Sequence, residues 1–578
     1  LGRLSQGDVA GNTLTRPGKG GGLSLENGSH LVLQALNITG NGAFFAGGLY
    51  VENSAPTLQA VRIAGNTAVY GGGVLLTEGA DATMQRVEVF DNEAKDFGGG
   101  VLVEGSTPNI VHATFLRNNA GLEGGAIYLH GGASCSLRNS LLSNNTARSG
   151  GGVYAREGSV LQAGSVTVEG NVAAANGGGL YLEKGSVVGE GCTLRLNRAG
   201  NGGGLYCSGC DADLTGANVE GNSARLSGGG LFVDALGRLR VHGGVARANS
   251  ADTGGAGFIV GRLDCLRAVF EANRATSGAG LFLDSGDDQL ETFSLQETTF
   301  EANSARQNGG GVHVSTARGR VSACSFVQNA AAGAGGALAV DRRGSATVET
   351  VSCLRNRAHA QGGAVALLQG SLVVTDSVME GNFSPSGLGG AVALVSGSAR
   401  VTSGRFSRNS AREGGALHSS LDPAYLRLSG IAFLSNEASG GGDVFWLSKP
   451  FPGQELKCGG CEHEGPRSIA TEVTDLRFSS EVPAEVSSGQ TLPPFSVLFV
   501  DFYGNLVTSA APSICEIYEH PSFGANETGA LLTIRSKGQR VSAVDGAAHF
   551  DSLVVEGRLR QTYHLSVVCL PHEAVQPL

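Results

Sequence analysis

One acidic cluster in this 578-residue chain has the residue types for hydrolytic chemistry: Asp284, Asp287, Asp288 and Glu291 lie close together. Paired carboxylates can act as general acid and general base in glycoside cleavage, and carboxylate oxygens can also hold calcium. No EF-hand or GGxGxD spacing accompanies them. An insertion loop with solvated acidic side chains is therefore the simpler interpretation.

Cysteines form a second group with chemical potential, because two CxxC pairs occur some 250 residues apart. Zinc ligation would require the pairs to meet in space, which a rigid repeat array forbids, so we expect local disulfides. Cys192, Cys324 and Cys353 occupy inward positions of the repeat and are expected to be small buried hydrophobes. The disulfide candidates are Cys207 with Cys210, Cys458 with Cys461, and Cys515 with Cys569.

The 12 histidines are scattered, and no Ser/His/Asp set, phosphate-binding loop or metal-ligand spacing can be recognised. We therefore predict no catalytic residue, no cofactor and no metal site.

The secondary-structure elements that position these residues follow a sequence repeat. An asparagine recurs sixteen times, from Asn41 to Asn436, at intervals of 24 to 30 residues. Alanine follows two positions later in every case but Asn382, and glycines and a short apolar triplet come next. A fixed period of this size indicates stacked repeats that share one core. The predicted inward ladder comprises Asn66, Asn92, Asn118, Asn145, Asn171, Asn197, Asn222, Asn249, Asn273, Asn303, Asn329, Asn356, Asn409 and Asn436.

Residues just before each ladder asparagine alternate between apolar and polar types, as in Val87-Glu88-Val89. That period of two predicts strands with one buried face, while 92 glycines disfavour helices. A repeat of about 26 residues with short strands and glycine corners predicts a right-handed parallel β-helix of about 17 coils over residues 1–447. Replacing a ladder residue, as in Asn222→Ala, is expected to cost roughly 1–3 kcal/mol.

The middle residue of the triplet is expected to face outward and to form an exposed apolar stripe on ten coils. This stripe is a candidate contact surface for a partner domain, a second copy or a glycan, although simple packing between coils would also explain it. Its members are Tyr50, Leu75, Leu102, Tyr128, Tyr154, Tyr181, Tyr206, Phe232, Ile259 and Phe282.

Composition narrows the cellular setting. A net charge of −10 disfavours nucleic-acid binding, and no apolar run is long enough for a transmembrane helix. The chain begins with Leu and reads as a mature or excised fragment, which favours a secreted or cell-surface protein. Five sequons occur, at Asn27, Asn37, Asn144, Asn382 and Asn526; Asn27, Asn37 and Asn526 are the glycosylation candidates, whereas Asn382 is discounted as a ladder residue.

The period stops near residue 448, and a cap or linker is expected over 448–468. Glycine thins out from about 469, and alternating strands separated by turn residues predict an Ig-like β-sandwich over 469–578. The stretch Val500 to Asn505 is similar to the D-x-x-G-N turn of filamin-like and bacterial-adhesin Ig-like modules.

Paired FxxN and GGA[ILV] motifs, such as Phe115 to Asn118 with Gly124 to Ile127, resemble the repeats of chlamydial polymorphic outer-membrane proteins. That resemblance covers roughly residues 20–447 and implies a surface-exposed β-helical passenger used in adhesion. Many repeats here read GGG rather than GGA, and an Ig-like domain follows where that family has a membrane barrel. The combination also resembles large secreted proteins of algae and other protists.

Gly286-Asp287-Asp288 resembles the acid pair of polygalacturonases, which are β-helix enzymes, but their NTD, GHG and RIK motifs are absent. We therefore expect a non-enzymatic extracellular rod for structure or adhesion. Its expected partners are other extracellular proteins, further copies of itself or cell-wall glycans. The alternative is a β-helix protein that binds or cleaves polysaccharide.

Overall fold

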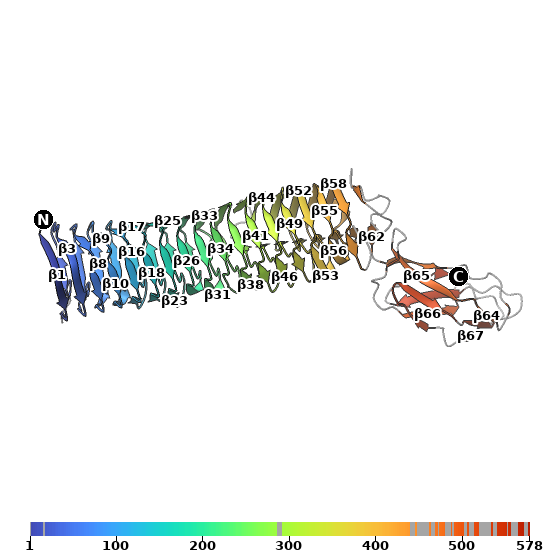
Figure 1. Ribbon diagram of the computed structural model, residues 1–578. Helices are drawn as coiled ribbons and strands as arrows, with labels where there is room; N and C mark the ends of the chain where they lie inside the picture. Colours follow the sequence, from blue (N-terminus) through green and yellow to red (C-terminus); the bar gives the residue numbers. More distant parts are fainter. Residues whose placement is uncertain are drawn as a thin grey trace. The chain divides into compact units, whose positions relative to one another are not determined.

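The computed structural model describes residues 2–14, 18–285 and 292–439, together with shorter stretches towards the C-terminus (Figure 1). These stretches are 445–447, 462–463, 469–471, 473–479, 487, 490–501, 506–507, 514–519, 533–535, 540–551, 553–556, 565–570 and 576–577. The chain divides into two units. The first comprises Leu1–Arg357 and Leu367–Ser377, and the second comprises Ala358–Ala366 and Val378–Leu578.

One coil of the first unit shows the plan of the repeat. After Asn92 the chain forms β11 (Glu93–Phe97), β12 (Val101–Glu104), β13 (Asn109–Val111) and β14 (Thr114–Leu116). Each strand pairs in parallel with its counterpart one coil later: β15 (Asn119–Ala120), β16 (Ile127–His130), β17 (Ser134–Arg138) and β18 (Leu141–Ser143). Repetition of this pairing builds parallel sheets whose strands follow one another as rungs (Figure 1).

We call the sheet that contains β12 and β16 the C sheet. It carries the candidate site. Between residues 23 and 340 it has one strand per coil. Its strands are β2 (Leu23–Leu25), β4 (Leu49–Glu52), β8 (Val74–Thr77), β12, β16, β20 (Val153–Arg156), β24 (Leu180–Glu183), β28 (Leu205–Ser208), β32 (Leu231–Val233), β35 (Gly257–Ile259), β39 (Leu281–Leu283), β43 (Val312–Val314) and β47 (Leu338–Val340).

Alternation along each strand decides which side chains fill the core. In β14 the central Phe115 is fully buried, while Thr114 and Leu116 on either side are half-buried. Equivalent residues of successive coils stack: the rings of Phe270 and Phe300 are 4.9 Å apart, and Phe326 follows at 4.8 Å. The core is therefore one continuous column of apolar layers, which no single coil could form alone.

The asparagine ladder lies inside this column, with Asn41 to Asn356 at most 1% exposed. From each asparagine, the backbone N and Nδ2 donate to Oδ1 of the asparagine one coil later, at 2.9–3.2 Å. Asn12, which the periodicity did not include, also donates to Asn41 Oδ1 from both nitrogens at 3.0 Å. The buried amides thus satisfy one another from coil to coil.

Glycines after the ladder solve two local problems. Gly98 has a φ of +66°, which a residue with a side chain adopts only under strain. At Gly99 a Cβ would lie 2.4 Å from the carbonyl oxygen of Asn119 in the next coil, so only glycine fits. Alanine is tolerated at the third position, as at Ala126.

The second unit contains Asn382, Asn409 and Asn436 in the same ladder arrangement. Parallel pairing in this unit reaches β62 (Ile469–Thr471), which pairs with β60 (Phe445–Leu447), and so extends past the expected boundary at 447. The expected cap at 448–468 lies mostly outside the described residues.

Further along, strands pair antiparallel. They include β65 (Phe495–Asp501) with β63 (Val473–Phe478), and β66 (Ile514–Glu519) with β71 (Leu565–Leu570). A buried apolar cluster that includes Phe499, Ile517 and Phe550 accompanies them. An Ig-like sandwich stays a prediction for this region.

In the described part of the chain the one helical element is a 3-10 turn, η1 (Pro423–Tyr425). Among those residues no helix is both long and apolar enough to cross a membrane. The prediction of an all-β parallel solenoid is confirmed, and it has about 16 turns.

Candidate functional site

A column of stacked aromatic rings runs along the C sheet, one ring from each of ten successive coils. Neighbouring ring centroids are 4.5 to 5.9 Å apart, and interplanar angles do not exceed 25°. We call this column the aromatic stack. Its members are Phe45, Tyr70, Phe97, Tyr128, Tyr154, Tyr181, Tyr206, Phe232, Phe258 and Phe282.

The ring comes from two different places in the coil. From Tyr128 onward it is the middle residue of the C-sheet strand, as the sequence predicted. In the three preceding coils the ring belongs to the residue just before the glycine corner: Phe45, which is followed by Ala46 and then glycine, Tyr70 and Phe97. The sequence analysis missed these three, although leucines at positions 75 and 102 beside an aromatic before the glycines were a usable signal.

Strand register corrects one member of the predicted stripe. Phe258 pairs with Phe232 and Phe282 in the stack, whereas Ile259 points into the core and is 1% exposed. The apolar triplet there begins with Gly257 rather than an aliphatic residue, so counting from the apolar side chains shifts the register by one.

Solvent exposure of the stripe is much lower than expected. Tyr50, Tyr128 and Tyr154 are only 3–5% exposed, and Leu75 and Leu102 are 4% exposed. Tyr181, Tyr206 and Phe232 are half-buried. The expectation of a continuous exposed apolar patch is therefore wrong, because rings of neighbouring coils and the row before the glycines cover one another.

The stack nevertheless borders a groove of about 640 Å³ near the N-terminal end of the first unit. Leu75 and Leu102 lie at its base, where later coils carry Tyr or Phe. The two coils with leucine lie between Tyr50 and Tyr128, and a hollow spans them, lined also by the rings of Tyr70 and Phe97. We call this hollow the aromatic groove. Its lining is Lys19, Phe45, Tyr50, Glu52, Tyr70, Leu75, Thr77, Glu78, Phe97, Leu102, Glu104, Tyr128, His130, Arg156 and Glu157.

One end of the groove holds an internal cation. Lys19 Nζ lies 4.9 Å from the centroid of the Tyr50 ring and pairs with the Glu52 carboxylate. The Tyr50 hydroxyl donates to Glu52 Oε2 at 2.5 Å. The hydrogen bond from Lys19 lowers the pKa of Glu52, and burial raises the pKa of Tyr50 to about 12. At this end of the groove the charges of Lys19 and Glu52 therefore neutralise each other beside the Tyr50 ring.

The opposite end holds a second cation. Arg156 Nη1 lies 3.5 Å from the Tyr128 hydroxyl, and Arg156 Nη2 is 2.5 Å from Glu157 Oε1. Burial raises the pKa of Tyr128 to about 12, so the hydroxyl stays protonated. Here too the carboxylate at the rim is matched by a basic side chain of the same chain.

Beyond this end, two carboxyl groups flank one tyrosine. The Tyr154 hydroxyl donates to Glu183 Oε2 at 2.6 Å, and Glu123 Oε2 is buried without a hydrogen-bond partner in the described part of the chain. Burial raises the pKa of Glu123, against the opposing influence of Arg156. A carboxyl group of this kind can donate a proton.

The acidic cluster that the sequence analysis interpreted as a solvated loop rather than a hydrolytic site is described only in part. Asp284 accepts hydrogen bonds from the Thr316 hydroxyl and from Ser285 N, the latter at 3.0 Å. Asp287, Asp288 and Glu291 lie outside the described residues. Groups of three or more His, Cys, Asp or Glu that could hold a metal are not found among the residues that are described.

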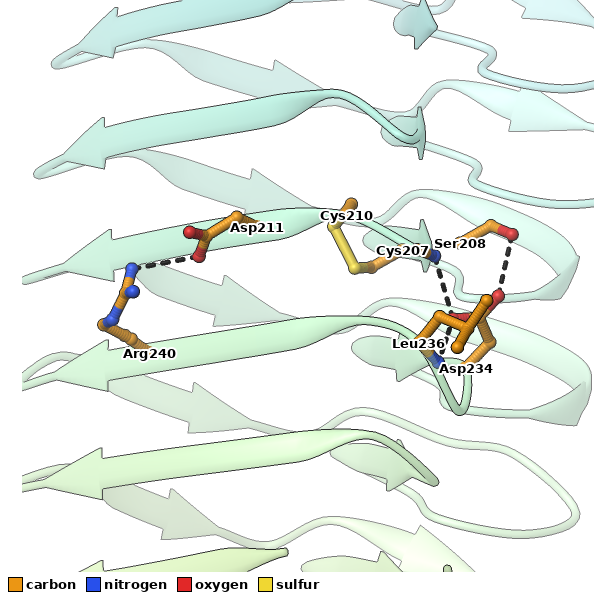
Figure 2. The surroundings of a disulfide bond; sticks show 8 residues. Cys207, Ser208, Cys210, Asp211, Asp234, Leu236 and Arg240 are labelled. Atoms are coloured by element: carbon orange, nitrogen blue, oxygen red, sulfur yellow. Dashed lines mark hydrogen bonds and ion pairs between the residues drawn. A yellow bond between two sulfur atoms is a disulfide. The ribbon is translucent and has the colours of Figure 1, made fainter. Parts of the chain in front are cut away.

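Two of the three cysteine pairs can be located. Cys207 and Cys210 form a disulfide at a tight corner between β28 and β29 (Asp211–Thr215) (Figure 2). Asp234 of the next coil holds that corner, accepting from Ser208 Oγ at 2.7 Å and Gly209 N at 2.9 Å (Figure 2). The bridge is buried and belongs to the packing of the corner.

A second disulfide joins Cys515 and Cys569, which lie opposite each other on β66 and β71. It therefore lies within one sheet, whereas the bridge of an immunoglobulin domain joins two sheets. Cys458 and Cys461 lie outside the described residues. Cys192, Cys324 and Cys353 are buried, as are Cys135 and Cys265.

The glycosylation candidates differ in access. Asn27 and Asn144 are exposed, and Asn37 is half-buried with its Nδ2 donating to Asp8 Oδ1 at 2.7 Å. Asn382 is fully buried in the ladder, and Asn526 is outside the described residues. Asn27 and Asn144 are therefore the more accessible acceptors.

Comparison with known proteins adds one match. The family model described as "Right handed beta helix region" matches residues 4–161, which include every residue of the aromatic groove. No curated protein matches the chain. Together, the match and the parallel solenoid fit a right-handed β-helix repeat protein.

Proposed function

We propose that this protein is a non-enzymatic extracellular or cell-surface scaffold whose stacked coils display a binding surface. The observation that carries this proposal is the unbroken ladder from Asn41 to Asn356, in which every coil is fixed to the next by the same amide hydrogen bonds. Such coupling favours a stiff array that holds side chains of many coils in register. The resemblance to adhesion passengers agrees with this role.

The longest coil of the first unit supports the same view. Asn273 and Asn303 are 30 residues apart, yet both nitrogens of Asn273 still donate to Asn303 Oδ1, at 3.0 and 2.9 Å. The additional residues therefore leave the ladder hydrogen bonds of this coil unchanged. An insertion that leaves the coil geometry unchanged is what a scaffold tolerates.

An extracellular setting is proposed from the cysteine and asparagine chemistry. Disulfides such as Cys207–Cys210 persist in oxidising compartments, and the other described cysteines are buried rather than available for exchange. Asn27 and Asn144 offer exposed sequons. Partners of such a scaffold are other extracellular proteins, further copies of the chain or cell-wall glycans.

A second candidate function is polysaccharide cleavage, which the pair of Glu123 and Glu183 around Tyr154 favours. Glycosidases use a pair of carboxyl groups, one of which has a raised pKa, as Glu123 does here. The pair lies next to an aromatic groove, where a sugar ring could stack. The proposal of a scaffold assigns these groups to packing instead.

Turnover assays separate the two functions. The purified full chain is incubated with pectate, polygalacturonate and neutral β-glucans, and new reducing ends or unsaturated products are measured. No turnover is expected. Product formation that disappears in Asp287→Asn, Asp288→Asn or Glu123→Gln would establish an enzyme and refute the scaffold.

A further inference from the structure

The aromatic groove has an unbalanced charge at its centre. At the two ends each carboxylate is matched, Glu52 by Lys19 and Glu157 by Arg156. The central coils, which carry Leu75 and Leu102, present Glu78 and Glu104 instead. Within the described chain neither of these two is paired with a lysine or an arginine. Glu104 accepts from the Thr77 hydroxyl at 3.0 Å and lies 3.7 Å from His130.

The walls beside these two carboxylates are aromatic. Tyr70 and Phe97 stack on each other at 5.9 Å, and both are half-buried, so part of each ring is available to a ligand. A ring face next to a carboxylate attracts a cation, because the quadrupole of the ring and the negative charge act together. The exposed parts of the same rings, which pack on the buried Leu75 and Leu102, supply apolar surface for the methylene stem of such a ligand.

The protein already contains an example of the arrangement. Lys19 lies over the Tyr50 ring while its ammonium group pairs with Glu52. In the central coils Tyr70 and Phe97 occupy the position that Lys19 has in its own coil, so the carboxylates of Glu78 and Glu104 lie near aromatic rings without a lysine from the described chain. A lysine side chain from outside would complete the pattern at Glu78 and Glu104.

We propose that the aromatic groove binds a lysine-rich segment of a partner polypeptide. Lysine ammonium groups pair with Glu78 and Glu104, and their stems lie against the solvent-facing parts of the Tyr70 and Phe97 rings. The inference rests on the proposed scaffold function and names the chemistry of its partner. The charge of the lining, with four glutamates against one lysine and one arginine, favours a cationic peptide over a neutral glycan.

Isothermal titration of the full chain with hexalysine tests the proposal, with hexaglutamate and a neutral hexasaccharide as comparison ligands. Hexalysine is expected to bind, and its Kd is expected to rise with salt because exposed charges are screened. Hexaglutamate and the hexasaccharide are expected not to bind.

Two variants locate the site. Leu75→Tyr with Leu102→Tyr adds larger side chains beside Tyr70 and Phe97 and fills the groove; the Kd should rise more than tenfold. Glu78→Gln with Glu104→Gln keeps the shape and removes the charge, and should weaken binding about tenfold. The matched control is Glu190→Gln with Glu301→Gln, which removes two exposed carboxylates outside the groove and should change the Kd less than twofold. Thermal unfolding of each variant checks that it is folded.

Three results would overturn the inference. Hexalysine binding that persists in both groove variants would place the cation site elsewhere. Hexasaccharide binding that only the filled variant loses would make the groove a glycan site, and would leave the scaffold function standing. Absence of hexalysine binding at low salt would exclude the lysine-rich partner. Turnover of any glycan would instead refute the scaffold itself, independently of these titrations.

Discussion

Removing one rung of the asparagine ladder should weaken the solenoid locally and strongly. The Asn222 side chain makes four hydrogen bonds. Its Nδ2 donates to Leu194 O at 2.8 Å and to Asn249 Oδ1 at 3.1 Å. Its Oδ1 accepts from N and Nδ2 of Asn197, both at 3.0 Å. All of these atoms lie where water does not reach, since the asparagines are 0% exposed.

In Asn222→Ala the backbone N–H of Asn197 loses the acceptor it has in the structure, and Leu194 O loses a donor. Asn197 Nδ2 keeps its bond to Val168 O, and Asn249 Oδ1 keeps the bond from Asn222 N, so these two groups are only partly affected. One orphaned buried donor and the loss of several net hydrogen bonds together amount to about 2–4 kcal/mol.

Hydrogen exchange followed by mass spectrometry suits this prediction, because a repeat array opens locally rather than as one cooperative unit. A local loss of that size should speed exchange of the Asn197 amide and its neighbours by roughly 30- to 1,000-fold. Asn218→Ala is the matched control: it makes the same change in the same coil at an exposed position of β30 (Asn218–Glu220) and should leave exchange unchanged. Equal exchange in the two variants would refute the structural role assigned to the ladder.

Two further predictions concern the C sheet. His313 is buried against the Phe282 ring, and burial lowers its pKa to about 4. The contribution of the neutral imidazole to the free energy of unfolding is therefore fully present above pH 6.5, and that free energy should fall by about 3 kcal/mol as the pH drops from 6.5 to 4. His313→Phe should remove this acid sensitivity from the denaturation midpoints, and an unchanged pH profile would contradict the prediction. Tyr154→Ser should lower the unfolding free energy by about 3 kcal/mol, because the ring is stacked on both sides and only 3% exposed. A change below 1 kcal/mol in urea unfolding would show that the ring packs loosely.

Much of the solenoid was predictable because its determinants are local in sequence and repeat. Each ladder asparagine must occupy one buried corner, and the glycines after it meet backbone atoms of the next coil, as Gly99 meets Asn119. A substitution at either place would disturb any coil in the same way, so the same residues recur in each repeat and the pattern can be recognised from the sequence alone.

The aromatic groove was not predictable on the same grounds. Tyr70 and Tyr128 belong to different positions of the repeat, and only the three-dimensional stack shows that their rings lie in one column. The hollow lies where leucine replaces the ring of the C-sheet strand, and in the sequence this leucine looks like an equivalent apolar residue. In the sequence Glu78 and Glu104 likewise look like ordinary surface carboxylates. Only the structure shows that they lack the basic partners that Glu52 and Glu157 have.

Footprinting of the full chain with hydroxyl radicals, with and without saturating hexalysine, tests the central claim most directly. The account predicts protection of Tyr70 and Phe97, whose half-buried rings wall the groove, and unchanged reactivity of Tyr206 and Phe232, which are equally half-buried in the same stack. Protection at Tyr206 and Phe232, or none at Tyr70 and Phe97, would contradict a lysine-binding groove at this end of the scaffold.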